Sequence, residues 1–149
     1  MGKELIRITV PGKPIAKKRP RFARRGKFVM TYNDQETEEG RFLWDVKRQF
    51  TGETVKEAIG VYLKFFMPIP KSASKKQIVM MIGGDVAHTK KPDIDNLIKF
   101  TLDCLNGVVF EDDSQIVDLH LTKRVSKQMP GIFVIVENAI DEKLVELPY

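Results

Sequence analysis

The chain of 149 residues contains one cysteine, two histidines and no run of 18 or more apolar residues. One cysteine excludes an internal disulfide and a cysteine-rich zinc site. Cys104 has apolar neighbours and is expected to be a small residue of the core. Without a long apolar run there is no transmembrane helix. The first residues also lack the apolar segment of a signal peptide, so we expect a cytoplasmic protein.

Acidic residues are missing from the most basic part of the chain. Eight cations and no Asp or Glu fall between residues 13 and 27, whereas the net charge of the whole chain is +5. These candidate DNA-binding residues are Lys13, Lys17, Lys18, Arg19, Arg21, Arg24, Arg25 and Lys27. Phe22, Phe28 and Tyr32 lie in or beside this stretch, and aromatics among cations suit a phosphate backbone with unpaired bases. The alternative is a solvated arm without a ligand.

Hydrophobic periodicity predicts one domain over residues 1–149, with an α+β (mixed α/β) fold. We expect a small mixed sheet and two main helices in the order β-α-β-α-β-β. Strands are expected at 4–10, 59–67, 115–125 and 131–137, the last two as an antiparallel pair. Helices are expected from Asn33 or Asp34 to about Phe50, and from about 94 to 106. Gly52 and Gly107 are placed to cap their C-terminal ends.

Other segments carry weaker signals. Residues 13–32 are expected to form a long basic loop with a hairpin turn at 24–27, and residues 74–82 permit a short helix. Trp44 is expected to pack with the apolar residues of the first helix. His88 and His120 are isolated in the sequence and are expected on the surface or in packing rather than in catalysis.

The acidic residues concentrate in Asp-Ile-Asp-Asn-Leu-Ile-Lys, residues 93–99, and in the pair Asp112-Asp113. Asp93 and Asp95 are too close to share one face of a regular helix and fit better at its start, where an aspartate can cap free N–H groups. Capping accounts for one of them, but two close carboxylates repel each other unless a cation lies between them. Asp93, Asp95 and Asp113 provide the oxygen ligands that Mg²⁺ prefers, with Asp112 as a further ligand or an outer contact.

Several carboxylates close to a lysine suit a reaction at a phosphate group. A bound Mg²⁺ would activate a water and stabilise a leaving oxygen, and Lys99 would offset the charge that develops on the phosphate. Asp95, Lys99 and Asp103 are spaced by four and line one face of an otherwise apolar helix. The alternative for this stripe is an ion-pair ladder. We expect it instead to face a cleft, because the helix is predicted to be largely buried.

An Asp-x-Asp alone also occurs in glycosyltransferases and in haloacid-dehalogenase-type phosphatases. The chain is short for the first fold, and its motif lies too late in the sequence for the second. The longer pattern comprises Lys91–Lys99, Leu102–Gly107 and Asp112–Val117. It resembles the RusA family of Holliday junction resolvases, found in bacteria and their prophages. Looser similarity covers most of the chain, including the basic segment Lys18–Arg21.

This resemblance implies a Mg²⁺-dependent homodimeric endodeoxyribonuclease, with Mn²⁺ as a substitute metal, that cuts two opposed strands of a four-way junction. The products would be symmetric nicks with 5′-phosphate and 3′-hydroxyl ends, ready for ligation. The family's catalytic residues correspond to Asp93, Asp95, Lys99 and Asp113. Strands 59–66 and 132–136 are candidates for the dimer surface. The alternatives are a non-catalytic protein that binds branched or single-stranded DNA, and a less structure-selective metal-dependent nuclease.

Overall fold

The computed structural model describes residues 2–19, 21–32, 34–84 and 86–139; between 21 and 32 it describes the side chains of 24 and 26–29 alone. The strands are β1 (Glu4–Pro11), β2 (Arg21–Arg25), β3 (Phe28–Tyr32), β4 (Ile59–Met67), β5 (Ile116–Val125) and β6 (Gly131–Asn138). The helices are α1 (Glu36–Gln49), α2 (Lys75–Ile82), α3 (Ile94–Leu105) and the 3₁₀ turn η1 (Asp113–Gln115). None of the helices in these ranges is long and apolar enough to cross a membrane.

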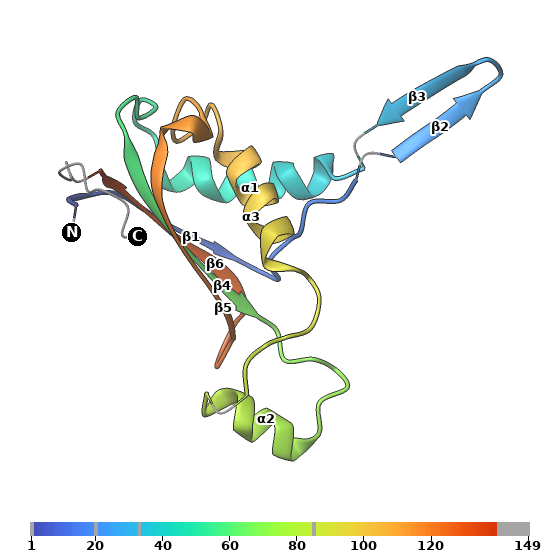
Figure 1. Ribbon diagram of the computed structural model, residues 1–149, viewed down its shortest axis with the longest axis vertical. Helices are drawn as coiled ribbons and strands as arrows, with labels where there is room; N and C mark the ends of the chain where they lie inside the picture. The colour runs from blue at the N-terminus through green and yellow to red at the C-terminus, as the bar shows by residue number, and fades with distance from the viewer. Residues whose placement is uncertain (1, 20, 33, 85, 140–149) are drawn as a thin grey trace, which may run out of the picture.

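A four-stranded mixed sheet with the order β1-β6-β4-β5 forms the centre of the molecule (Figure 1). The α+β class and a central strand at 59–67 are confirmed. The predicted antiparallel pairing of the last two strands is wrong, because β4 lies between them, parallel to β5 and antiparallel to β6. The backbone N–H of Ser126 donates to the carbonyl of Met67 at 2.8 Å, so the connection between β5 and β6 passes the end of β4. The turn signal thus located a connection but not the strands that pair.

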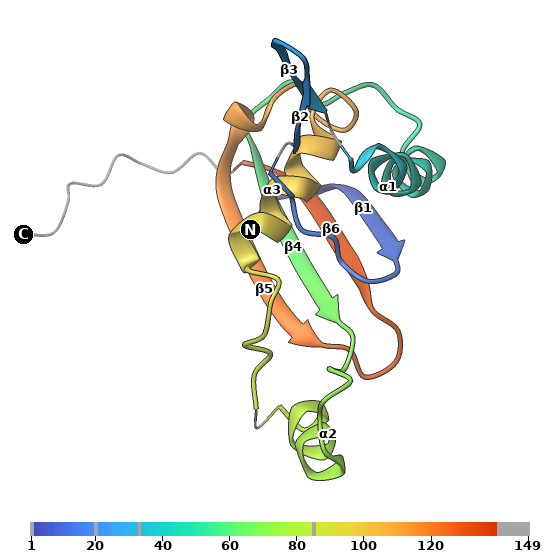
Figure 2. The same ribbon diagram turned by 90° about the vertical axis from the view of Figure 1, so that its right-hand side faces the viewer.

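The core lies between this sheet and the two long helices, which cover the same face of it (Figures 1 and 2). Alternate residues of β4, such as Val61, Leu63 and Phe65, are buried toward the helices. Phe42 of α1 meets Phe100 of α3 edge to face, with ring centres 5.9 Å apart. The inward residues of β4 and β6 therefore fill the monomer core, and both strands are interior, so neither supplies a sheet edge to a second copy.

The predicted limits of α1 need correction. Gln35 occupies the N-cap, whereas Asn33 lies outside the described residues, and the helix ends at Gln49 with Phe50 as the C-cap instead of Gly52. Trp44 is not packed in the core: its side chain is 65% exposed, and the Arg48 guanidinium lies 4.7 Å from its ring centre. Residues two apart on a helix point in different directions, so burial of Phe42 turns Trp44 outward.

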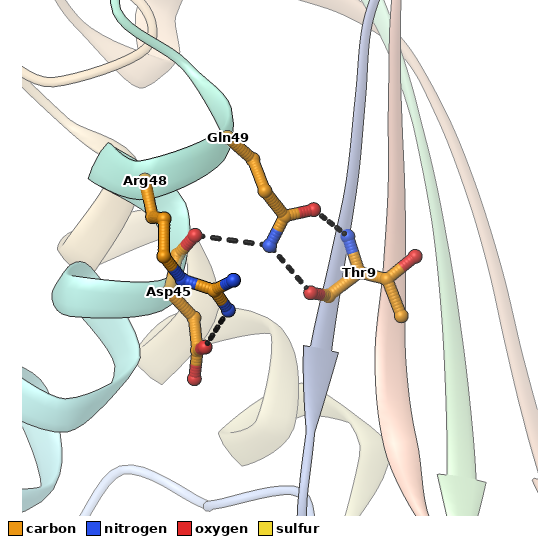
Figure 3. Close-up of polar contacts among 4 residues, drawn as sticks. All are labelled: Thr9, Asp45, Arg48 and Gln49. Carbon is orange, nitrogen blue, oxygen red and sulfur yellow. Dashed lines mark hydrogen bonds and ion pairs between the residues drawn. The ribbon is translucent and has the colours of Figure 1, made fainter.

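The two edges of the sheet differ. At the outer edge of β1, the side-chain amide of Gln49 accepts the N–H of Thr9 at 2.9 Å and donates to its carbonyl at 2.7 Å (Figure 3). The same amide nitrogen donates to the carbonyl of Asp45, which holds it in place. Gln49 thus satisfies backbone groups that a neighbouring strand would otherwise bind. On β5, Val117 and Leu119 are exposed at 61% and 40%. An edge strand of this kind is a template for pairing with another chain.

Candidate active site

Asp93 occupies the N-cap position of α3, where its backbone is extended. Its carboxylate nevertheless makes no capping hydrogen bond and instead accepts one from the Lys91 ammonium at 2.9 Å. This hydrogen bond, together with the charge of Asp93, raises the pKa of Lys91. Both side chains are exposed, at 49% for Asp93 and 83% for Lys91. Helix capping therefore does not account for Asp93, and its carboxylate is accessible to a ligand.

The polar stripe of α3 is exposed rather than cleft-bound. Asp95, Lys99 and Asp103 are exposed, while Leu97 and Phe100 on the other faces are buried. The ion-pair ladder does not form: Asp103 pairs with the Lys17 ammonium at 3.3 Å. Within the described ranges the Lys99 ammonium makes no hydrogen bond or ion pair. Asp93, Asp95 and Lys99 thus present two carboxylates and one ammonium to solvent from the N-terminal half of one helix.

Lys123, on β5, forms hydrogen bonds that connect the segment before Asp93 to the sheet. Its ammonium donates to the carbonyls of Lys90 at 2.9 Å and Pro92 at 3.0 Å. Sequence reasoning missed this residue. A signal was present, because the alternation of β5 puts Lys123 on the same face as the partly buried Leu121, where an apolar residue would be expected.

The first part of the basic segment runs beside α3. The N–H of Lys17 donates to the carbonyl of Asn96 at 2.9 Å. Gln35, 1% exposed, holds the same segment by accepting the N–H of Lys18 and donating to the carbonyl of Ala16, both at 2.9 Å. Sequence analysis did not identify Gln35, because its partners lie almost twenty residues earlier in the chain. These contacts bring cations close to the start of α3.

A cavity of about 650 Å³ lies between this segment and α1 and reaches Lys91 and Pro92, directly before Asp93. Its cationic lining residues are Lys13, Lys17, Lys18, Arg41 and Lys91, and its acidic ones are Glu38 and Asp45. Neither Asp95 nor Lys99 lines it. The expected cleft therefore borders the polar stripe of α3 instead of containing it.

The predicted DNA-binding residues divide into two groups. Lys17 pairs with Glu39 at 3.8 Å as well as with Asp103, and Lys18 approaches Glu38 at 3.9 Å. The other described cations of the set, which are Lys13, Arg19, Arg24 and Lys27, are exposed. The side chains of Arg21 and Arg25 lie outside the described part. The hairpin predicted at 24–27 is confirmed, with β2 and β3 as its strands.

The second acidic pair is held in a different local structure. The Asp112 carboxylate accepts the N–H of Ser114 at 3.3 Å, and the Gln115 side chain accepts the N–H of Asp112 at 2.9 Å. Hydrogen bonding from Ser114 to the Asp112 carboxylate lowers the pKa of Asp112. The amide of Gln115 also donates to the carbonyls of Val55 and Glu57, which fixes η1 beside the start of β4. Asp112 is thus a capping residue, and the adjacent Asp113 is exposed.

The two acidic groups lie at opposite ends of the site region. Lys123, near the C-terminal end of β5, reaches the start of α3, whereas η1 ends at Gln115, directly before the N-terminal end of β5. The eight residue-to-residue steps from Gln115 to Lys123 span roughly 26 Å as a strand, and α3 itself is about 18 Å long. Among residues 2–19, 21–32, 34–84 and 86–139, no three His, Cys, Asp or Glu side chains form a group that could hold a metal ion. One copy of the chain therefore does not bring Asp113 to Asp93 and Asp95.

The remaining chemistry-bearing residues behave as packing or surface groups. His88 is buried, which lowers its pKa, with a further contribution from the charge of Lys123. His120 is exposed and stacks on Tyr62 with ring centres 4.5 Å apart. Cys104 is buried in the core, and burial raises its thiol pKa to about 12. The expected positions, on the surface or in packing for the histidines and in the core for Cys104, are confirmed.

Comparisons with known proteins bear on this arrangement. Residues 11–137 match the family described as Endodeoxyribonuclease RusA. An uncharacterized protein of Bacillus subtilis, YqaN, is 34% identical over 89% of this chain and 96% of its own length. The crossover junction endodeoxyribonuclease RusA of Aquifex aeolicus is 24% identical over 64% of this chain and 62% of its own. The matched range includes both acidic groups, Lys99 and the basic segment, and the chain therefore belongs to the RusA family of endodeoxyribonucleases.

Proposed function

We propose that this protein is a Mg²⁺-dependent, homodimeric endodeoxyribonuclease that resolves four-way DNA junctions by paired symmetric nicks. Family membership supports the coarser statement, a Holliday junction endonuclease. The observation that carries the finer one is the exposed group of Asp93, Asp95 and Lys99 at the start of α3, beside a cationic segment. Carboxylates that make no helix cap, close to cations able to bind phosphate, suit hydrolysis of a phosphodiester.

The donor set fits a hard divalent cation. Asp93 at the N-cap and Asp95 in the first turn of α3 supply carboxylate oxygens, and Mg²⁺ binds through few carboxylates while it keeps several waters. When bound, Mg²⁺ would supply Lewis-acid polarisation of the phosphate and of an attacking water. Lys99 would bind a phosphate oxygen and offset its growing charge, and Lys123 would hold Asp93 in place through the Pro92 carbonyl.

The separation of Asp113 from Asp93 and Asp95 favours a dimeric site. Among the described strands, β5 pairs with β4 alone, and its exposed Val117 and Leu119 give it an apolar surface for a second copy. In a two-fold dimer the surface that one copy offers is offered by the other as well. We propose that Asp113 of the partner subunit completes each site. Two such sites in one dimer match two cuts in a two-fold symmetric junction.

The first experiment is cleavage of a labelled four-way junction by the full chain with Mg²⁺, compared with a flap and a linear duplex. Paired nicks that DNA ligase seals are expected at the junction, because 5′-phosphate and 3′-hydroxyl ends are ligatable. Binding without cleavage would mean a non-catalytic DNA-binding protein. Equal cleavage of all three substrates would mean a less structure-selective nuclease.

A mixing experiment tests the dimeric site. Asp93→Asn and Asp113→Asn are each expected to be inactive alone. In a mixed dimer, one site would combine both substitutions and the other would combine both native carboxylates, so mixing should restore single-strand nicking. If each site instead combines Asp93 and Asp113 of the same chain, every site in the mixture carries one substitution. Continued inactivity after demonstrated subunit exchange would therefore contradict the shared site.

A further inference from the structure

The hairpin of β2 and β3 has two exposed apolar side chains at its tip. Phe28 is 76% exposed and Val29 is 60% exposed. Gly26, with a positive φ of 60°, and Lys27 form the two-residue turn between Arg25 and Phe28. In both views the hairpin extends away from the helices and the four-stranded sheet (Figures 1 and 2). The core of the monomer therefore does not explain these two apolar residues.

The two residues point to opposite faces of the hairpin. Phe28 pairs with Arg25 and Val29 pairs with Arg24, and consecutive residues of a strand project to opposite sides. A flat partner surface would cover one of them and leave the other in water. A partner that surrounds the tip would cover both. The hairpin is thus shaped as a wedge and not as a docking face.

The charge around the tip limits what that partner can be. Residues 11–33 contain no Asp or Glu, and the described cations Arg24 and Lys27 are exposed beside Phe28 and Val29. Cations next to an exposed aromatic suit a polyanion that also offers unpaired or unstacked bases. Proteins that distort DNA insert apolar side chains of this size between base steps.

We propose that Phe28 and Val29 enter the branch point of a four-way DNA junction, where Phe28 stacks on a base that has lost its neighbour. This inference rests on the proposed function, because it takes its substrate from it. At the branch point of a junction, the two strands of each arm part and continue into different arms, and no strand ends there. A hairpin tip inserted at this point can therefore contact bases on both of its faces. Arg24 and Lys27 would contact the phosphates that converge around it.

The test uses the full chain, with Ca²⁺ replacing Mg²⁺ to prevent cleavage, and a junction carrying 2-aminopurine beside the branch point. Binding of the unchanged protein should raise the fluorescence of the probe as its base unstacks. Phe28→Ala should abolish most of that rise and weaken junction binding by roughly five-fold or more, the effect of losing one stacked base. Binding to linear duplex should not change. Phe28→Trp should restore the fluorescence response.

Met129→Ala is the matched control, because Met129 is 73% exposed in the connection between β5 and β6, away from the hairpin. It should behave as the unchanged protein. An undiminished fluorescence rise with Phe28→Ala, or equal losses on junction and duplex, would overturn the wedge. Cleavage in Mg²⁺ is scored separately. Normal junction cleavage without a fluorescence response rejects the wedge alone, and a response without any cleavage rejects the proposed activity alone.

Discussion

Asp93 and Asp112 each stand at the N-terminal end of a helical segment with an extended backbone, but their carboxylates make different contacts. Asp112 accepts a backbone N–H from its own turn. Asp93 accepts none and meets the flexible, exposed ammonium of Lys91. A lysine side chain in solvent is easily displaced, whereas a capping hydrogen bond belongs to the fold.

The sequence around each aspartate accounts for the difference. Gln115 follows Asp112 by three residues and returns a hydrogen bond to its N–H, which is the capping-box pattern. Asn96 follows Asp93 by three, and its side chain is too short to serve in the same way. Asp112 is thus tied into its turn from both sides, while Asp93 remains available to a metal ion.

The largest effect is expected from Asp93→Asn. Loss of the carboxylate should lower junction cleavage by more than about 100-fold, the upper range for residues that only orient metal ligands. Thermal stability should not fall, since no capping bond is lost and Asn suits an N-cap. Junction affinity in Ca²⁺ should stay close to that of the unchanged protein. A cleavage rate near normal in Mg²⁺ would remove Asp93 from the site.

A smaller effect is expected from Lys123→Met, which keeps the length of the side chain and removes its two hydrogen bonds to the Lys90 and Pro92 carbonyls. Asp93 should then be less well positioned. We expect about ten-fold slower turnover and a higher Mg²⁺ requirement, with little change in KM for the junction. Lys123→Arg should recover part of the activity. An unchanged Mg²⁺ requirement with a lowered Tm would mean that Lys123 acts on stability alone.

Local patterns in the sequence predicted the elements well. The alternation of residues 4–10 and the β-formers of 59–67 correspond to β1 and β4, and the helical pattern from 94 corresponds to α3. Ser74 with Gln77 forms a capping box, and α2 begins directly after Ser74 as the short helix predicted there. Such features depend on neighbours within a few residues, and the sequence displays those neighbours.

Long-range arrangement was not predictable in the same way. Asp113 follows Asp93 by only twenty residues, which favoured one cluster, but α3 carries the chain away from Asp93 over its full length. The stripe of Asp95, Lys99 and Asp103 was predicted to face a cleft, but it is exposed, and Lys17, distant in sequence, pairs with Asp103. The order of the sheet was missed for a similar reason, since a short connection is compatible with a strand inserted between its neighbours.

The smallest effect, on stability more than on cleavage, is expected at Asp112. Asp112→Ala should lower Tm slightly at neutral pH, and Asp112→Ser should recover most of the loss because a serine hydroxyl can accept the same N–H. The pKa of Asp112 is lower in the folded protein than in the unfolded chain, so its stabilisation is present above the usual carboxyl pKa and fades as the pH falls through the lowered value. The Tm difference between the unchanged protein and Asp112→Ala should therefore shrink in acid. If Asp112→Ser keeps its Tm but loses cleavage as severely as Asp93→Asn, Asp112 is a metal ligand, and the contrast between the two aspartates does not hold.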